Sequence, residues 1–175
     1  MSTTLYYGLI MAVGQIVITL LGYFLGFQTD KINEGAWFGI VPLVYAIGVY
    51  LMGIRAVREE SPGKYLTYGK GVGTGLMIAL YAGLIGSIYA YIHFSYINPS
   101  FADYLVEANK VKWAAKGMSD AQMEGAEKFV RMFTRPAMQA VVGFVMSIFF
   151  GLIISLITSA FQKRNPPEEG QVAAT

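Results

Sequence analysis

The sequence contains no cysteine and few charged residues for its length. The lack of cysteine excludes disulfides, iron–sulfur clusters, thiolate zinc sites and cysteine nucleophiles. Charged residues make up 14% of the 175 residues, whereas an average soluble domain contains about 25%. A chain with so little charge cannot coat a water-facing surface, and 55% of its residues are hydrophobic. The composition therefore predicts an integral membrane protein.

Other features that particular functions require are also scarce. The formal net charge is +2 and no basic block is long, which argues against a nucleic-acid partner. No Asp, Glu, Lys or Arg falls in the middle of the apolar segments, where proton-coupled pumps, voltage sensors and di-metal carboxylate oxidases need such groups. His93 is the single histidine, so most hydrolytic sites cannot be assembled. We therefore expect a non-enzymatic protein with no catalytic residue, no metal and no cofactor.

Four apolar segments are long enough to cross the hydrocarbon core of a bilayer, which takes about 20 helical residues. They lie at about 5–27, 37–57, 71–97 and 137–161. The first is a retained anchor, because no basic residue precedes Lys31 and its apolar run is too long for a signal peptide. Asn98-Pro99 ends the third, and Pro136, with Thr134 as the candidate cap, opens the fourth. The sequence predicts an all-α integral membrane protein with four transmembrane helices and one domain, 1–165.

The segment 98–135, between the third and fourth spans, is an amphipathic helical insert. Its first part has a predicted apolar stripe of Phe101, Tyr104, Leu105, Ala108, Val111 and Ala115. Its second part opens with a capping box, Ser119 to Gln122, and continues with the stripe Met123, Ala126, Val130 and Phe133. A helical hairpin with a charged face in water is favoured over helices lying at the membrane interface or over the mouth of the spans. The tail 166–175 is expected to be flexible.

Small residues recur at every fourth position in the last two spans. The third span carries the ladder Gly71, Gly75, Ala79, Gly83 and Ser87, and the fourth carries Gly143, Ser147, Gly151, Ser155 and Ser159. This spacing is the small-xxx-small pattern of helices whose backbones pack closely. Because a period of four drifts about 40° per step on a helix, only two or three consecutive rungs are expected at one contact. A phosphate-binding loop at residues 71–75 is disfavoured, because no strand precedes it.

Two polar side chains are candidates for a polar site. Gln15 lies near the middle of the first span, where its amide either joins helices by a hydrogen bond or contacts a substrate. His93 lies toward the end of the third span among tyrosines and phenylalanines. We interpret it as part of an aromatic belt at the membrane interface, with a ligand role in a site shared between subunits as the alternative.

Short motifs give the chain a resemblance to a known family. They are the aromatic and glycine-containing entry to the third span (residues 65–71), its exit Ile97-Asn98-Pro99-Ser100-Phe101, the Ser119–Gln122 pair, Pro136, and a last span that closes with Lys163-Arg164. The sequence resembles the bacterial membrane family "domain of unknown function 4199" over nearly its whole length. The resemblance implies a bacterial inner-membrane protein with four helices, and it supplies no reaction, ligand or catalytic residue.

These features leave two functions open. A non-enzymatic scaffold or subunit, packed in a homo-oligomer or with other membrane subunits in the lipid bilayer, is favoured by the ladders and the absence of central charges. The alternative is a conduit for a small solute or ion, formed by an oligomer and lined by Gln15, Tyr81 and hydroxyl groups. Four basic residues around the second loop lie close to span ends, namely Arg55, Arg58, Lys64 and Lys70. The positive-inside rule therefore favours both termini in the cytoplasm.

Overall fold

A computed structural model describes residues 1–165, and the predicted flexible tail at 166–175 lies outside the described residues. The described residues form helices and no β-strand. The four longest helices are α1 (Thr3–Phe24), α2 (Ile40–Glu60), α3 (Tyr68–Ile92) and α6 (Pro136–Gln162). A 3-10 turn before α2 and a π-helical turn after α3 extend these two to Gly35–Glu60 and Tyr68–Ile97. All four are long and apolar enough to cross a membrane, which confirms the predicted fold class.

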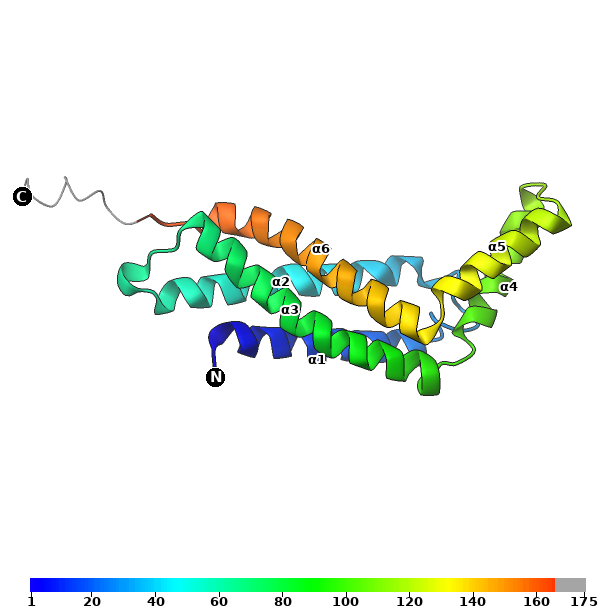
Figure 1. Cartoon of the computed structure of the whole chain (residues 1–175), viewed down its shortest axis with the longest axis horizontal. Coiled ribbons are helices and arrows are strands. Elements are labelled where there is room, and N and C mark those ends of the chain that lie inside the picture. The colour runs from blue at the N-terminus through cyan, green and yellow to red at the C-terminus, as the bar shows by residue number, and fades with distance from the viewer. Residues whose placement is uncertain (166–175) are drawn as a thin grey trace, which may run out of the picture.

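The four long helices run side by side (Figure 1), with α3 packed against both α1 and α6. The N-terminus, the loop between α2 and α3, and the end of α6 lie at one end of the molecule. The loop and the chain after α6 are joined there by two backbone hydrogen bonds between Leu66 and Arg164, of 2.8 and 2.9 Å. A hairpin of α4 (Phe101–Ala115) and α5 (Asp120–Phe133) extends from the opposite end.

Local chemistry accounts for the helix ends, with one correction. Ser119 and Gln122 form the predicted capping box of α5, each side chain bonding to the other residue's backbone N–H. Thr134, predicted to cap α6, instead ends α5, because its hydroxyl donates to the Val130 carbonyl at 2.8 Å. Pro136 occupies the first turn of α6 and leaves Arg135 in extended geometry, so Arg135 takes the cap position.

The inward face of α4 also differs from the predicted stripe. Val111 of that stripe is 71% exposed and Tyr104 is 39% exposed, whereas Val106, outside the stripe, is buried. Apolar side chains occupy two arcs of this helix, one around Val111 and one around Val106 and Trp113. Periodicity alone identifies such arcs but does not decide which of them meets the partner helix.

The core of the molecule lies where the four long helices meet. It consists of Met11, Ala12, Val49, Tyr50, Ile78, Ala79, Ala82 and Ile154. Each long helix therefore contributes a narrow buried strip, and most other apolar side chains on these helices are exposed, as membrane-spanning helices require in lipid. Gln162 ties α6 to α2 near the termini, where its side-chain N–H donates to the Leu51 carbonyl at 2.8 Å.

Candidate functional site

The structure brings the two ladders of small residues together along the α3–α6 contact. A Cβ added to Gly71 would lie 2.6 Å from Ser159 Oγ, and one added to Gly75 would lie 2.6 Å from Ser155 Cβ. Farther along, a Cβ on Gly151 would lie 2.5 Å from Ala79 Cβ. Real Cβ contacts are not this short, so the two backbones approach to a distance that only these small residues permit.

The ladder contact is longer than the two or three rungs expected. A Cβ on Gly83 would lie 3.1 Å from Ser147 Oγ, so the consecutive α3 rungs from Gly71 to Gly83 all meet α6. Small side chains let the helices approach so closely that rungs on both sides of the crossing point stay in contact. The fifth pair differs, because a Cβ on Gly143 would meet nothing within 4 Å. Over most of their length, the two ladders therefore pack against each other within one chain.

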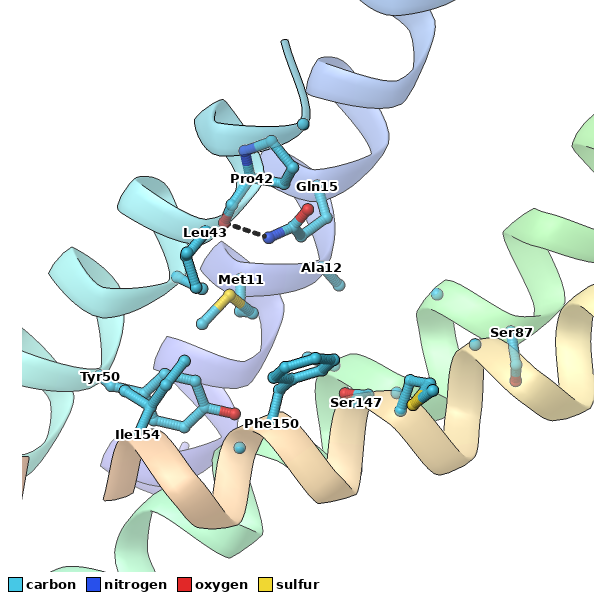
Figure 2. Close-up of a pocket in the computed structure, with 18 residues that line it drawn as sticks. Met11, Ala12, Gln15, Pro42, Leu43, Tyr50, Ser87, Ser147, Phe150 and Ile154 are labelled. Atoms are coloured by element: carbon cyan, nitrogen blue, oxygen red, sulfur yellow. Dashed lines mark hydrogen bonds between the residues drawn. The ribbon is translucent and has the colours of Figure 1, made fainter. Parts of the chain in front are cut away.

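A cavity of about 510 Å³ lies beside the inner part of the ladder contact and extends past its end (Figure 2). Its walls come from α1, α2, α3 and α6 and are mainly apolar. Met11 and Ala12 form a buried floor, whereas Leu43, Met146 and Phe150 on α2 and α6 are 45%, 47% and 50% exposed. The cavity therefore opens sideways between α2 and α6, within the part of the molecule that spans the membrane. Its volume falls within the range of about 300–1,000 Å³ that ligand pockets occupy.

Gln15 is the polar side chain that projects from α1 into this cavity. Its amide nitrogen donates to the Pro42 carbonyl of α2 at 3.1 Å, so the amide joins two helices near the middle of the membrane. Ser87 and Ser147 also line the cavity, and their hydroxyls donate to the Leu84 and Ala79 carbonyls at 2.9 and 3.1 Å. Among residues 1–165, no Asp, Glu, Lys or Arg lines the cavity.

Tyr81, expected to line a conduit with Gln15, is not at the cavity wall. Its side chain packs instead against Gly8 of α1, where a Cβ on the glycine would lie 2.6 Å from Tyr81 Cβ. At the end of the cavity toward the termini, Tyr50 and Ile154 are 3% and 7% exposed and belong to the packed core. The described part of a single chain therefore provides a pocket closed on that side, and not a continuous polar path.

His93 lies in a second polar cluster, and its interpretation as part of an interfacial aromatic belt is wrong. The ring is fully buried, at 0% exposure, at the start of the π-helical turn His93–Ile97. Its Nε2 lies 2.8 Å from Gln28 Oε1 and its Nδ1 lies 3.0 Å from the Tyr89 hydroxyl. Asn98 completes the cluster by donating to the Gln28 carbonyl at 3.2 Å. Gln28 comes from the segment after α1, whereas Tyr89 lies in α3 and Asn98 follows the π-helical turn, and these polar groups hold the ring inside.

The hydrogen bonds of this cluster fix the His93 tautomer. The Gln28 side-chain nitrogen donates to the Thr19 carbonyl at 2.9 Å, which leaves its oxygen as an acceptor facing His93. His93 Nε2 must therefore carry the proton, and Nδ1 must accept from the Tyr89 hydroxyl. Every polar atom of the ring is thus satisfied within the chain, an arrangement that fastens the segment after α1 to the end of α3.

Sequence reasoning did not identify Gln28, because it lies 65 residues from His93 in a connecting segment. Tyr45 was also missed, although its hydroxyl donates to the Ile10 carbonyl at 2.5 Å and joins α2 to α1. Neither residue belongs to a periodic pattern or a motif. Within residues 1–165, no three His, Asp or Glu side chains come close enough together to hold a metal ion.

The sequence was compared with protein families, with curated proteins and with solved structures. Neither the curated proteins nor the solved structures gave a match. One family matches, the one described as "Protein of unknown function (DUF4199)", and its match covers residues 6–164. This range includes the ladders, the cavity and the His93 cluster. Because the match extends over most of the chain, the protein belongs to the DUF4199 family, as the motifs around the third span indicated.

Proposed function

We propose that the protein is a non-enzymatic subunit or scaffold of the bacterial inner membrane, and that a partner subunit binds to its α4–α5 hairpin. The observation that carries the proposal is that both hairpin helices keep an apolar strip uncovered. Val111 of α4 is 71% exposed, and Phe129 of α5 is 59% exposed with its ring 4.5 Å from that of Phe133. Uncovered apolar and aromatic side chains on a water-facing element are typical of protein interfaces.

Ion pairs between the two helices of the hairpin favour one orientation of these strips. Arg131 of α5 pairs with Asp103 of α4 at 2.7 Å and with Glu127 at 2.9 Å, and Lys110 of α4 lies 3.4 Å from Glu127. The pairs Arg131–Asp103 and Lys110–Glu127 join the two helices, and the capping box at Ser119 fixes the start of α5. A preorganised surface loses less conformational entropy when a partner binds.

The ladders no longer support self-association, since they pack against each other inside one chain. The hairpin is therefore the surface to test. Figure 1 shows the hairpin directed away from the long helices, and so away from the lipid around them. A protein partner is therefore favoured over the lipid surface. Both termini are proposed to be cytoplasmic, which places the hairpin on the opposite side. Single cysteines at Ser61 and Ser119 test this placement: an impermeant thiol reagent should label position 119 in intact cells and spare position 61.

A photoreactive amino acid placed in the hairpin tests the binding surface in native membranes. Substitution at Val111 or Phe129 should give a cross-linked product with one protein of defined mass, shared by both positions. Glu124 is the matched control, because its side chain is 68% exposed but lies on the charged face of α5. Cross-links to lipid alone would instead assign the strips to the membrane interface, and cross-links equal at all three positions would contradict a specific surface.

A further inference from the structure

We infer that the cavity between α2 and α6 is a binding site for an uncharged, long-chain alcohol dissolved in the bilayer, whose hydroxyl donates a hydrogen bond to Gln15. The inference rests on the cavity and its polar groups, and it is independent of the proposed hairpin surface. Three features of the cavity support it: the lateral opening, the apolar lining, and the Gln15 amide oxygen, which accepts no hydrogen bond from the described residues.

The lateral opening determines the route by which a ligand enters. The exposed rim residues Leu43, Met146 and Phe150 belong to membrane-spanning helices, so the opening faces hydrocarbon and not water. Toward the termini α2 and α6 are held together, where Tyr50 lies against Gly151 and Gln162 bonds to Leu51. A ligand therefore arrives from within the bilayer, and its body must be apolar to be dissolved there.

The amide of Gln15 determines the chemistry of the ligand's polar end. Because the Pro42 carbonyl can only accept, the amide nitrogen faces Pro42 and the oxygen turns away from it (Figure 2). Among the hydrogen bonds of residues 1–165, none is donated to this oxygen. The oxygen is not enclosed by protein, so it is open to whatever occupies the cavity. An acceptor without a donor in hydrocarbon is costly, and a ligand hydroxyl removes that cost.

The two serines at the cavity favour the same class of ligand. Ser87 and Ser147 both use their hydroxyl hydrogens in bonds to backbone carbonyls, so toward the cavity they offer only lone pairs. Tyr50 also lines the cavity, and its hydroxyl can donate. The cavity therefore offers acceptors at Gln15 and the two serines and a donor at Tyr50, a combination that a ligand hydroxyl matches because it both donates and accepts. Because no Asp, Glu, Lys, Arg or His among residues 1–165 lines it, a charged headgroup would be left without a counter-ion. A phospholipid acyl chain fits the apolar walls but brings no donor to Gln15.

Two glycines permit a test that leaves the helix packing intact. Gly143 lines the cavity and Gly48 lies on α2 away from it, and an added Cβ at either position meets nothing within 4 Å. Gly143→Leu should fill the cavity without a clash, and Gly48→Leu should place the same side chain elsewhere on a spanning helix. The pair separates loss of the site from a general effect of replacing a helical glycine.

The probe is hexadecanol carrying a diazirine in its chain, added to the purified full-length protein in phosphatidylcholine nanodiscs. We expect saturable labelling near Gln15 and Phe150, with competition by unlabelled hexadecanol and about three- to tenfold weaker competition by its methyl ether, which cannot donate. Gly143→Leu should abolish the saturable labelling, and Gly48→Leu should keep it. Gln15→Leu should remove the preference for the alcohol over the ether while labelling persists.

Three results would overturn the inference. Labelling that never saturates would show that the probe only samples the lipid around the protein. Equal competition by the alcohol and the ether would show an apolar slot for any chain, with no role for the Gln15 oxygen. Equal labelling of the Gly143→Leu and Gly48→Leu proteins would place the probe outside the cavity.

Discussion

The closest approach of α3 and α6 can be tested by adding one methyl group. In the Gly151→Ala variant, the new Cβ would lie 2.5 Å from Ala79 Cβ and 2.5 Å from the Tyr50 hydroxyl oxygen. The Tyr50 side chain is long and can move a little, but the Ala79 methyl is attached directly to the α3 backbone. The clash with Ala79 is therefore relieved mainly by moving one helix away from the other.

The size of the effect follows from this distance. Carbon atoms in good contact lie about 3.5–4.0 Å apart, so the helices must separate by about 1 Å at this rung. A radial gap of that size forfeits about a quarter to a half of the attraction between the surfaces that separate. The neighbouring rungs, Gly75 against Ser155 and Gly83 against Ser147, are close enough to lose contact as well. We expect a loss of about 1–3 kcal/mol in the free energy of unfolding, typical of an overpacked core.

Gly143→Ala is the matched control, because it makes the same change eight residues earlier on the same ladder. Its Cβ would meet nothing within 4 Å, so the substitution should be neutral or stabilise α6 by up to about 1 kcal/mol through higher helix propensity. Thermal unfolding of both variants in mild detergent, followed by circular dichroism, measures the difference. Equal midpoints for the two variants, or a Gly151→Ala protein as stable as the wild type, would refute the assigned packing.

Three further predictions concern polar groups. Ser159 Oγ is buried without a hydrogen-bond partner among the described residues, so Ser159→Ala should raise the free energy of unfolding by up to about 1 kcal/mol; a lower unfolding midpoint would show that the hydroxyl has a favourable partner. Gln28→Leu removes the acceptor of His93 Nε2–H and should destabilise the protein by about 1–3 kcal/mol; an unchanged midpoint would contradict the assigned tautomer. In the hairpin, the hydrogen bond from Arg131, aided by Lys110, holds the pKa of Glu127 below its ordinary value of 4.5. Because a lowered pKa stabilises the folded state only while the carboxyl is ionised, the hairpin should loosen as the pH falls below about 4.5. Hydrogen exchange of α5 amides, corrected for the intrinsic rate, should show this loosening in the wild type and not in Glu127→Gln.

The four spans were predictable from the sequence because hydrophobic length is a local property. A run without charges, such as the one that begins near Leu5, has no alternative to a buried or lipid-facing helix. The cap at Ser119 was predictable for a similar reason, since its partner Gln122 lies three residues away. The inward face of α4 was not, because Val106 and Val111 are equally apolar and only tertiary packing decides which of them is buried.

The polar site was less predictable, because hydrogen bonds join residues that are distant in sequence. The position of His93 indicated an interfacial ring, but burial depends on Gln28, which reaches it from the segment after α1. Gln15 was identified as a polar group near the middle of the membrane, yet its partner is a backbone carbonyl, at Pro42, and any residue type could have supplied one. No pattern in a single sequence encodes such pairs.

The same small residues account for both the tight contact and the cavity. Where a glycine of α3 faces a serine of α6, as at Gly75 and Ser155, the two backbones come close together. At the last pair of the ladders, Ser87 and Gly143, the added Cβ on the glycine finds no neighbour, and both residues line the cavity. A period of four drifts about 40° per step around each helix, so the two ladders must eventually turn away from each other. Beyond that point the missing side chains leave empty volume that α1 and α2 do not fill. The cavity accordingly extends from the contact rungs Gly83 and Gly151, which also line it, past the end of the ladder contact. The Gly151→Ala and Gly143→Ala pair compares a tight rung with an open one on the same helix face.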